Sequence, residues 1–242
     1  MKEYAIEVEN LSIQYKGLRS FSIKKNFFGS KRQKAEVFEA VKNVSFKLEK
    51  GEILGLVGRN GSGKSTMLRA IAGIFSPNSG SVNLHGNSIS LLSIGVGFQR
   101  ELSGRENILL SGMLLGFSEK EIQERMDEII EFSELGKFID APVRTYSSGM
   151  YSKLAFSITA ILETDIILID EVLSVGDAKF RQKSYKKMKQ LITDKDKTVV
   201  IVSHDRKTIA DLCDKVLWIN DGEMMQFGET QAVLAAYDEF MK

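Results

Sequence analysis

A glycine-rich loop set between an apolar run and a helical segment constrains this chain more than any other feature. Residues 53–57 (Ile-Leu-Gly-Leu-Val) form a short continuous apolar run, which is typical of a strand buried on both faces. The loop that follows reads Gly58-Arg59-Asn60-Gly61-Ser62-Gly63-Lys64-Ser65-Thr66, and residues 65–72 are predicted to form a helix that stops at Gly73. The loop matches Gly-x-x-x-x-Gly-Lys-Ser/Thr in full, in the strand–loop–helix context that this pattern requires.

The physical chemistry of this loop predicts phosphate binding. Glycines let the backbone curl so that several N–H groups point at one anion. The N-terminus of the following helix adds the positive end of its dipole. Lys64 is placed to reach the β- and γ-phosphates, and the Ser65 hydroxyl is placed to coordinate Mg²⁺. We therefore predict that ATP binds through Gly58, Asn60, Gly61, Ser62, Gly63, Lys64, Ser65 and Thr66. The alternative, a glycine-rich turn that matches by chance, does not account for the strand and helix beside it.

A second apolar run, residues 166–169, ends in two adjacent carboxylates, Asp170 and Glu171. The carboxyl ends of parallel strands open onto the ligand crevice of an α/β sheet. Asp170 is therefore the expected second anchor for Mg²⁺, through water, since Mg²⁺ keeps part of its hydration shell. Glu171 is the candidate general base for a water that attacks the γ-phosphate. The alternative is a pair of solvated acids in a turn.

His204 follows the apolar run 199–202 and is predicted to face the same crevice, where an imidazole can stabilise the γ-phosphate. A purely structural histidine is the alternative. His85, the other histidine, lies in a predicted turn and is assigned no function. Cys213 is the only cysteine, which fits a reducing cytosol, and we expect it to pack a helix.

Strand and helix patterns alternate along the chain. Strands are predicted at 4–15, 41–48, 53–57, 81–82, 89–92, 166–169, 199–202, 216–219 and 223–226, and helices at 65–72, 105–138, 147–162, 179–192 and 231–240. This alternation predicts an α/β fold, with a mostly parallel sheet and helices on both faces. We expect one domain over residues 1–242. Residues 1–98 and 161–242 are expected to form its core, and residues 99–160 an inserted helical subdomain.

Composition and charge restrict the class of protein. The 33 Lys plus Arg and 32 Asp plus Glu give a net charge of +1, which provides no signal for nucleic-acid binding. No stretch reaches the ~18 apolar residues of a membrane span, and the N-terminus lacks the apolar core of a signal peptide. Work at a membrane would therefore go through a partner or a peripheral surface.

Residues 16–35 hold seven basic residues, three phenylalanines and no acid. They are either a solvated loop or an element at the lipid headgroups.

Taken in order, these residues resemble the nucleotide-binding subunit of ABC (ATP-binding cassette) transporters over essentially the whole chain. The resemblance implies a P-loop NTPase (RecA-like) core with a parallel sheet, an N-terminal antiparallel β subdomain and an inserted α-helical subdomain. It also implies roles for further residues: Tyr15 as the aromatic that stacks on adenine, Gln99 as the Q-loop residue that binds ATP and metal, Asp170-Glu171 as Walker B, Ser174-Val175-Gly176-Asp177 as the D-loop, and His204 as the H-loop.

The sequence Tyr146-Ser147-Ser148-Gly149-Met150 stands where the family has its Leu-Ser-Gly-Gly-Gln signature. In this family two subunits pair head to tail, which implies that Ser147 and Gly149 contact the γ-phosphate of the partner's ATP. Ser148 replaces a glycine and Met150 a glutamine, which leaves the anion-binding serine and one glycine. The segment from Gln99 to Asn107 is shorter than the Q-loop segment that is usual in this family. The implied assembly is a homodimer around two Mg-ATP, joined to a separate transmembrane permease at the cytoplasmic face of the membrane.

Motifs at 93–98, 102–107, 146–150 and 170–177 resemble the branch that exports cell-surface polysaccharides such as O-antigen, capsule and teichoic acid. Members of this branch often carry a basic insertion like residues 16–35. The implied function is an ATPase that powers export of a lipid-linked polysaccharide.

One alternative is a cassette of an importer or drug exporter, against which only these motifs argue. Soluble cassettes that act on ribosomes or DNA usually carry two cassettes or long coiled coils. A non-catalytic binding module would not need Lys64, Asp170, Glu171 and His204 together.

Overall fold

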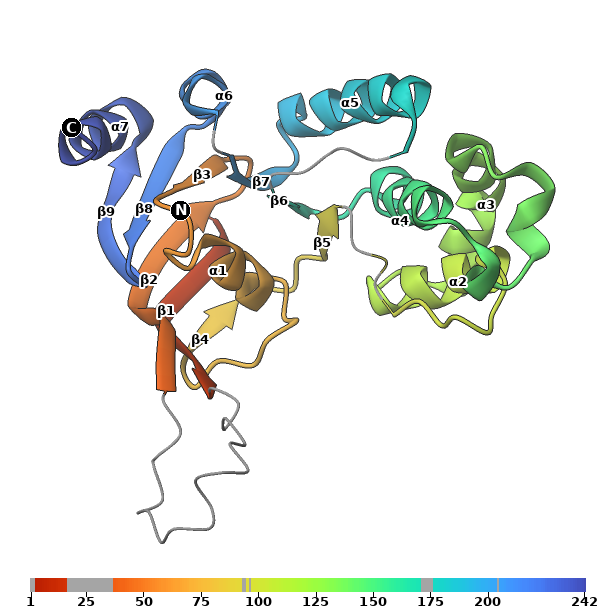
Figure 1. Ribbon diagram of the computed structural model, residues 1–242, viewed down its shortest axis with the longest axis horizontal. Coiled ribbons are helices and arrows are strands. Elements are labelled where there is room, and N and C mark those ends of the chain that lie inside the picture. Colours follow the sequence, from red (N-terminus) through yellow and green to blue (C-terminus); the bar gives the residue numbers. More distant parts are fainter. Residues whose placement is uncertain (1–2, 17–36, 93–94, 96, 171–175, 204) are drawn as a thin grey trace, which may run out of the picture.

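A nine-stranded sheet forms the body of the molecule, and a lobe of helices lies beyond one of its edges (Figure 1). The computed structural model describes residues 3–16, 37–92, 95, 97–170, 176–203 and 205–242. The strands are β1 (Tyr4–Lys16), β2 (Val37–Glu49), β3 (Ile53–Val57), β4 (Ser79–Asn83), β5 (Ile89–Leu92), β6 (Ile166–Asp170), β7 (Thr198–Val202), β8 (Lys215–Asn220) and β9 (Glu223–Glu229). The helices are α1 (Lys64–Ile71), α2 (Gly104–Leu114), α3 (Glu119–Ser133), α4 (Ser148–Leu162), α5 (Ala178–Thr193), α6 (Arg206–Leu212) and α7 (Thr230–Phe240), with 3-10 turns η1 (Gly136–Asp140) and η2 (Val143–Thr145).

The sheet order is β4-β1-β2-β9-β8-β3-β7-β6-β5. The strands from β8 to β5 pair in parallel, whereas β1 pairs antiparallel with β2 and β4, and β8 with β9. The α/β class predicted from the sequence is therefore confirmed, as is the antiparallel N-terminal part. The register places Asp170 of β6 opposite Val202 of β7, so these two strands end side by side.

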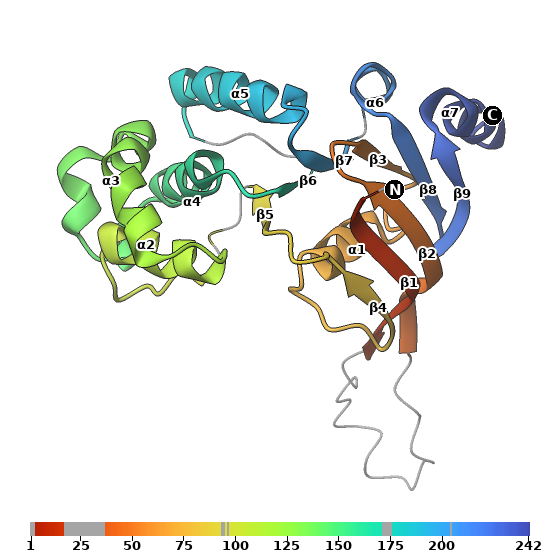
Figure 2. The same cartoon turned by 180° about the vertical axis from the view of Figure 1, so that it is seen from behind.

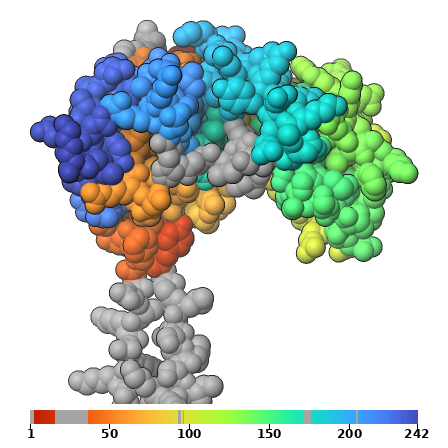
Figure 3. All heavy atoms as spheres, turned by 45° about the horizontal axis from the view of Figure 1, so that its top comes forward, coloured from red at the N-terminus to blue at the C-terminus, as the bar shows by residue number. Residues whose placement is uncertain are grey.

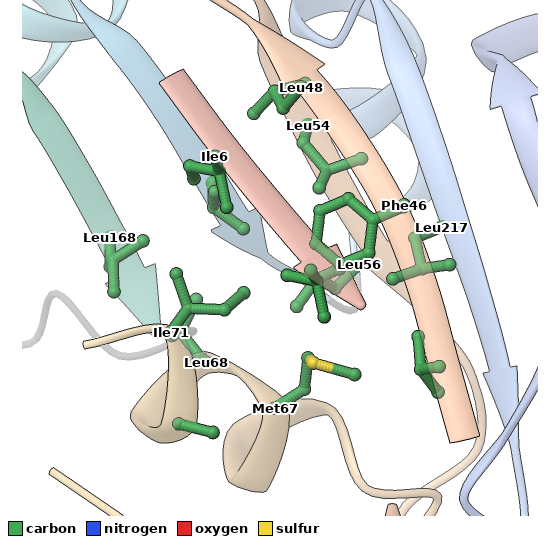
Figure 4. Close-up of a cluster of buried hydrophobic side chains, with 14 of the residues drawn as sticks. Ile6, Phe46, Leu48, Leu54, Leu56, Met67, Leu68, Ile71, Leu168 and Leu217 are labelled. Carbon is green, nitrogen blue, oxygen red and sulfur yellow. The ribbon is translucent and has the colours of Figure 1, made fainter. Parts of the chain in front are cut away.

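Each central strand is buried on both faces, which explains its continuous apolar run. In β6, Ile166 and Leu168 join the core that also contains α1, whereas Ile167 and Ile169 join the core on the opposite face. Figure 4 shows the first core, in which side chains of α1 pack among those of β1, β2, β3, β6 and β8. The second core receives side chains from α5, α6 and α7. Helices on both faces thus hold the carboxyl ends of β3 and β6 in place.

Two helical regions differ from the prediction, one in the helical lobe and one beside the sheet. The predicted helical stretch 105–138 is divided into α2, α3 and η1, because Gly116 adopts φ +97° and Ser118 caps α3. Both α2 and α3 begin with a capping box, formed by a serine and a glutamate three residues later. Helix α6 was not predicted, although Asp205 caps it by accepting from the N–H of Lys207. Among the described residues no helix is long and apolar enough to cross a membrane.

Candidate functional site

Residues 58–63 join β3 to α1, and Lys64, Ser65 and Thr66 are the first residues of α1, so the motif has the predicted strand–loop–helix order. Its first and last glycines are required by close backbone contacts. Gly58 has φ +152°, and a Cβ there would lie 2.1 Å from the carbonyl oxygen of Ile219. Gly63 has φ +107°, and a Cβ there would lie 2.2 Å from the carbonyl oxygen of Ala40. No side chain fits at either position without displacing a backbone. The loop is therefore tightly seated on β2 and β8.

Lys64 lies inside the curl of this loop. Its side chain is 6% exposed, and Nζ donates to the carbonyls of Gly58 (2.8 Å) and Arg59 (3.0 Å). An ammonium group has three donors, so one remains for a ligand. Burial lowers the pKa of Lys64, and the charge of Asp170 opposes that shift in part. The first-turn N–H groups of α1 have no acceptor within the helix and add a second set of donors for an anion.

The remaining predicted phosphate-binding residues differ in their exposure. Asn60 and Gly61 are exposed, and Ser62 is 3% exposed. The Ser62 hydroxyl has no hydrogen-bond partner among the described residues. Thr66 is half-buried, and its Oγ1 lies 3.2 Å from the hydroxyl of Tyr15. The loop thus presents exposed backbone at its tip and a buried hydroxyl within.

Tyr15, near the end of β1, is brought beside the loop by its contact with Thr66. Its ring is 38% exposed and meets the edge of Phe75, with ring centroids 6.0 Å apart. A partly exposed aromatic ring next to a phosphate loop suits the predicted role of stacking on a base. That role stays a prediction.

Ser65 and Asp170 meet although they are far apart in the sequence. The Ser65 hydroxyl donates to Oδ1 of Asp170 at 3.2 Å. A hydroxyl and a carboxylate are the oxygen ligands that Mg²⁺ accepts, together with phosphate oxygens and water. The described residues contain no group of three or more His, Cys, Asp or Glu side chains that could hold a metal alone. Ser65 and Asp170 therefore fit two of the oxygen ligands of a Mg²⁺ ion.

Gln99 has its backbone fixed while its side chain is exposed. The fully buried Asn107 side chain accepts from the N–H of Gln99 (2.7 Å) and donates to its carbonyl (3.0 Å), and it also donates to the carbonyls of Leu102 and Ser103. The described contacts of the Gln99 side chain do not include Ser65 or Asp170, so its role in binding ATP and metal stays a prediction. The anchoring by Asn107 was missed by sequence reasoning, because an asparagine at a helix start gives no sign that it is buried.

Ser147 caps α4, and its Oγ accepts from the N–H of Met150 at 3.2 Å. A cavity of about 550 Å³ opens there, lined by Ser147, Ser148, Gly149, Met150, Lys153 and Asp177 among others. Figures 1 and 2 show α4 and α1 in different parts of the molecule, and Figure 3 shows the helical lobe and the sheet as two bodies joined along one side. The structure therefore does not bring Ser147 and Gly149 to the phosphate loop of the same chain.

Two predicted catalytic residues, Glu171 and His204, lie outside the described residues, as do Ser174 and Val175 and the basic segment 16–35 apart from Lys16. Their neighbours in the sequence are described: Asp170 ends β6, and Asp205 caps α6. Cys213 is buried at the end of α6, and burial raises the pKa of its thiol to about 12. A thiol with that pKa is not a nucleophile at neutral pH, which agrees with the expected packing role.

An ion pair that the sequence did not predict joins α4, which begins with the signature residues, to α5, which follows the predicted D-loop 174–177. Lys153 of α4 donates to Oδ2 of Asp177 at 2.6 Å and lies 3.7 Å from Glu134. Asp177 caps α5 through the N–H groups of Lys179 and Phe180. The hydrogen bond from Lys153 holds the pKa of Asp177 at about 2, below its ordinary 3.8. The pair ties α4, and with it the signature, to the core.

This pair predicts a pH dependence of stability. A carboxyl whose pKa is lower in the folded state stabilises the fold above its unfolded pKa, and that contribution is lost as the pH falls from about 4 to about 2. Asp177→Asn keeps an N-cap side chain but removes the charge. We expect the variant to unfold at lower urea than the wild type at pH 6 and at the same urea near pH 2. Lys153→Met should give the same profile, and a constant difference across pH would contradict the pair.

Comparisons with known proteins find relatives over most of this chain. A family model described as ABC transporter matches residues 41–174. The teichoic acids export ATP-binding protein TagH of Lactococcus lactis is 44% identical over 240 residues, which are 98% of this chain and 51% of that protein. The O-antigen export system ATP-binding protein RfbB of Klebsiella pneumoniae is 46% identical over 208 residues, 86% of this chain and 84% of that protein. The chain thus spans about half the length of the Lactococcus relative.

A solved structure shows the same fold. The dimeric, post-hydrolysis structure of the ATP-binding cassette MJ0796 with ADP and Pi superimposes with a TM-score of 0.68 at 23% identity, over 93% of this chain and 98% of that one. At this identity the likeness concerns the fold alone.

Proposed function

Because this chain belongs to the ABC transporter family, we propose that it is the ATP-hydrolysing subunit of an exporter that moves a lipid-linked cell-surface polysaccharide through a separate membrane subunit. The observation that carries this proposal is the identity of 44% and 46% to teichoic acid and O-antigen export ATP-binding proteins, over 98% and 86% of this chain. The subunit would sit peripherally at the cytoplasmic face of the membrane.

The phosphate loop supports the ATP-binding part of the proposal. The remaining donor of Lys64 would reach the β- and γ-phosphates, while the first-turn N–H groups of α1 would bind their oxygens. Ser65 and Asp170, already in contact, would hold Mg²⁺. When bound, Mg²⁺ neutralises charge that develops on the β- and γ-oxygens. Glu171 would accept a proton from the attacking water, and His204 would contact the γ-phosphate.

The separation of the signature from the phosphate loop supports a dimer. Ser147 and Gly149 lie at the start of α4 in the helical lobe, where the helix N-terminus suits an anion. A head-to-tail pair of chains would place this start against the ATP on the partner's loop 58–66. Binding of ATP would close the dimer, and hydrolysis with product release would open it.

The alternative is an ATPase subunit of another kind of ABC transporter, an importer or a drug exporter. The relatives named above favour export of a polymer, because their names refer to teichoic acids and to O-antigen. Neighbouring genes distinguish the two: an adjacent six-helix membrane subunit and glycosyltransferases would favour polymer export. In cells, the polymer should vanish from the surface and accumulate inside, bound to lipid, when the chain is inactivated.

Glu171→Gln tests the proposed hydrolysis. The variant keeps the size of the side chain but cannot accept a proton, so kcat should fall by about 10²- to 10⁴-fold while Mg-ATP affinity is kept. Steady-state phosphate release and equilibrium ATP binding measure the two quantities, and gel filtration in Mg-ATP should show an accumulated dimer. Glu131→Gln, an exposed glutamate on α3, is the control and should turn over normally. Normal turnover in Glu171→Gln would mean that another group is the base.

A further inference from the structure

The C-terminal helix α7 contacts the phosphate loop through the side chain of Arg59. The guanidinium carbon of Arg59 lies 5.1 Å from the centroid of the Phe240 ring, in a cation–π arrangement. Its Nε also donates to the sulfur of Met241 at 3.5 Å. Arg59 occupies a variable position of the loop pattern, so the pattern itself gives its side chain no role. The contact thus reaches the loop from outside the phosphate site.

The backbone of the same residue lies inside the loop. The carbonyl of Arg59 accepts hydrogen bonds from the N–H of Ser62 (3.1 Å) and from Nζ of Lys64 (3.0 Å). Rotation of this peptide would break both bonds and leave the Lys64 ammonium without one of its two acceptors. Arg59 therefore joins the helix α7, on one side, to the central lysine of the loop, on the other.

A second contact between α7 and the loop runs through β8. The Trp218 ring is 6% exposed and packs against Phe240 and Tyr237, with ring centroids 5.1 and 5.5 Å apart. The next residue, Ile219, presents the carbonyl oxygen that leaves no room for a Cβ on Gly58. The aromatic cluster of Trp218, Tyr237 and Phe240 therefore lies directly behind the start of the loop.

The last turn of α7 is also fixed to α6. Arg206, the first residue of α6, donates from Nε to Oδ1 of Asp238 at 2.8 Å, and its Nη2 contacts Oδ2 of the same carboxylate. This two-point contact restrains the end of α7, because Phe240 and Met241 lie two and three residues after Asp238. The ring under Arg59 is thus held from two directions, by Trp218 and by the restrained helix end.

From these contacts we propose that α7 is a positioning element of the nucleotide site: Phe240 acts through Arg59 to hold the loop 58–66 in the conformation that binds phosphates. Phe240 is a positioning residue and has no contact with the reacting atoms. This inference rests on the proposed ATP binding by the loop. Loss of the ring would let the Arg59 peptide sample orientations in which Lys64 is less well placed. A smaller fraction of the molecules would then have the loop conformation that binds phosphates, and the apparent affinity for ATP would fall in proportion to that fraction.

The test is Mg-ATP affinity of the full chain, followed by the fluorescence of Trp218, the only tryptophan, or by calorimetry. Phe240→Ala and Arg59→Ala should each weaken Mg-ATP binding by about threefold to tenfold, the range expected for loss of a cation–π contact. The double variant should be no weaker than either single one, because both changes remove one shared contact. Phe240→Tyr, which keeps an aromatic face, should restore the wild-type affinity.

The outcomes separate this inference from the proposed function. Wild-type protein that fails to bind Mg-ATP would overturn the proposed function itself. If the wild type binds and both single variants bind within about twofold of it, α7 does not position the loop. Losses that multiply in the double variant would also overturn the inference, since they would show two independent effects. Glu239→Ala, an exposed residue of the same helix, is the matched control and should bind as the wild type does.

Discussion

Lys64→Met is expected to lower the affinity for Mg-ATP by about 100-fold or more. Methionine has nearly the length of the lysine stem, so the volume inside the loop stays filled, but the charge that would face the phosphates is removed. The carbonyls of Gly58 and Arg59 also lose the donor that they now share. A buried acceptor without a partner is destabilising, so the curl of the loop should loosen as well.

Equilibrium binding of Mg-ATP measures this effect, and thermal unfolding without nucleotide reports any loss of fold. Lys187→Met is the matched control: the Lys187 side chain is also largely buried, at 19% exposure, but its partner is Glu163, the residue that follows α4. The control should bind ATP as the wild type does. Lys64→Met that binds within about threefold of the wild type would show that the loop is not the phosphate site.

The strands around the loop could be predicted from the sequence because each is a continuous apolar run. Residues 53–57, 166–169 and 199–202 lie in the middle of the sheet with both faces covered, so no alternation interrupts them. The start of β2 was missed, because Val37 and Phe38 are 48% and 59% exposed and give no pattern of burial. The break between α2 and α3 depends on one glycine conformation at Gly116, which a helical period does not reveal.

Some contacts around the candidate site could be expected from the sequence, whereas no local pattern could reveal the others. The contact of Ser65 with Asp170 follows from two motifs at the carboxyl ends of strands in one sheet, which sequence reasoning can place together. The contacts of Asn107 with Gln99, of Lys153 with Asp177, and of Arg59 with Phe240 join segments that carry no shared motif. Such contacts depend on how helices pack against the sheet, and only the fold determines them.

A mixing experiment is expected to show that each ATP site needs two chains. All chains in it carry Glu171→Gln, so that bound ATP is kept. One chain also carries Lys64→Met, which disables its loop, and the other carries Gly149→Asp, which disables its signature. Gly149 has ordinary space for a side chain, its nearest neighbour to a Cβ being Ser147 Oγ at 3.9 Å, so the aspartate should not disturb the helix. Its charge would repel the γ-phosphate.

A dimer of either variant with itself would have two defective ATP sites, so ATP should not hold it together. A mixed dimer has one site where the two changes meet and one site where neither is present. Random mixing should make about half of the pairs mixed, so ATP-dependent dimers should appear in the mixture and in neither separate preparation. Gel filtration in Mg-ATP with differently tagged chains measures this, and Gly149→Ala, which adds no charge, is the control for the signature change. A mixture that forms no more dimer than its components would show that the loop and the signature do not share a nucleotide across the dimer.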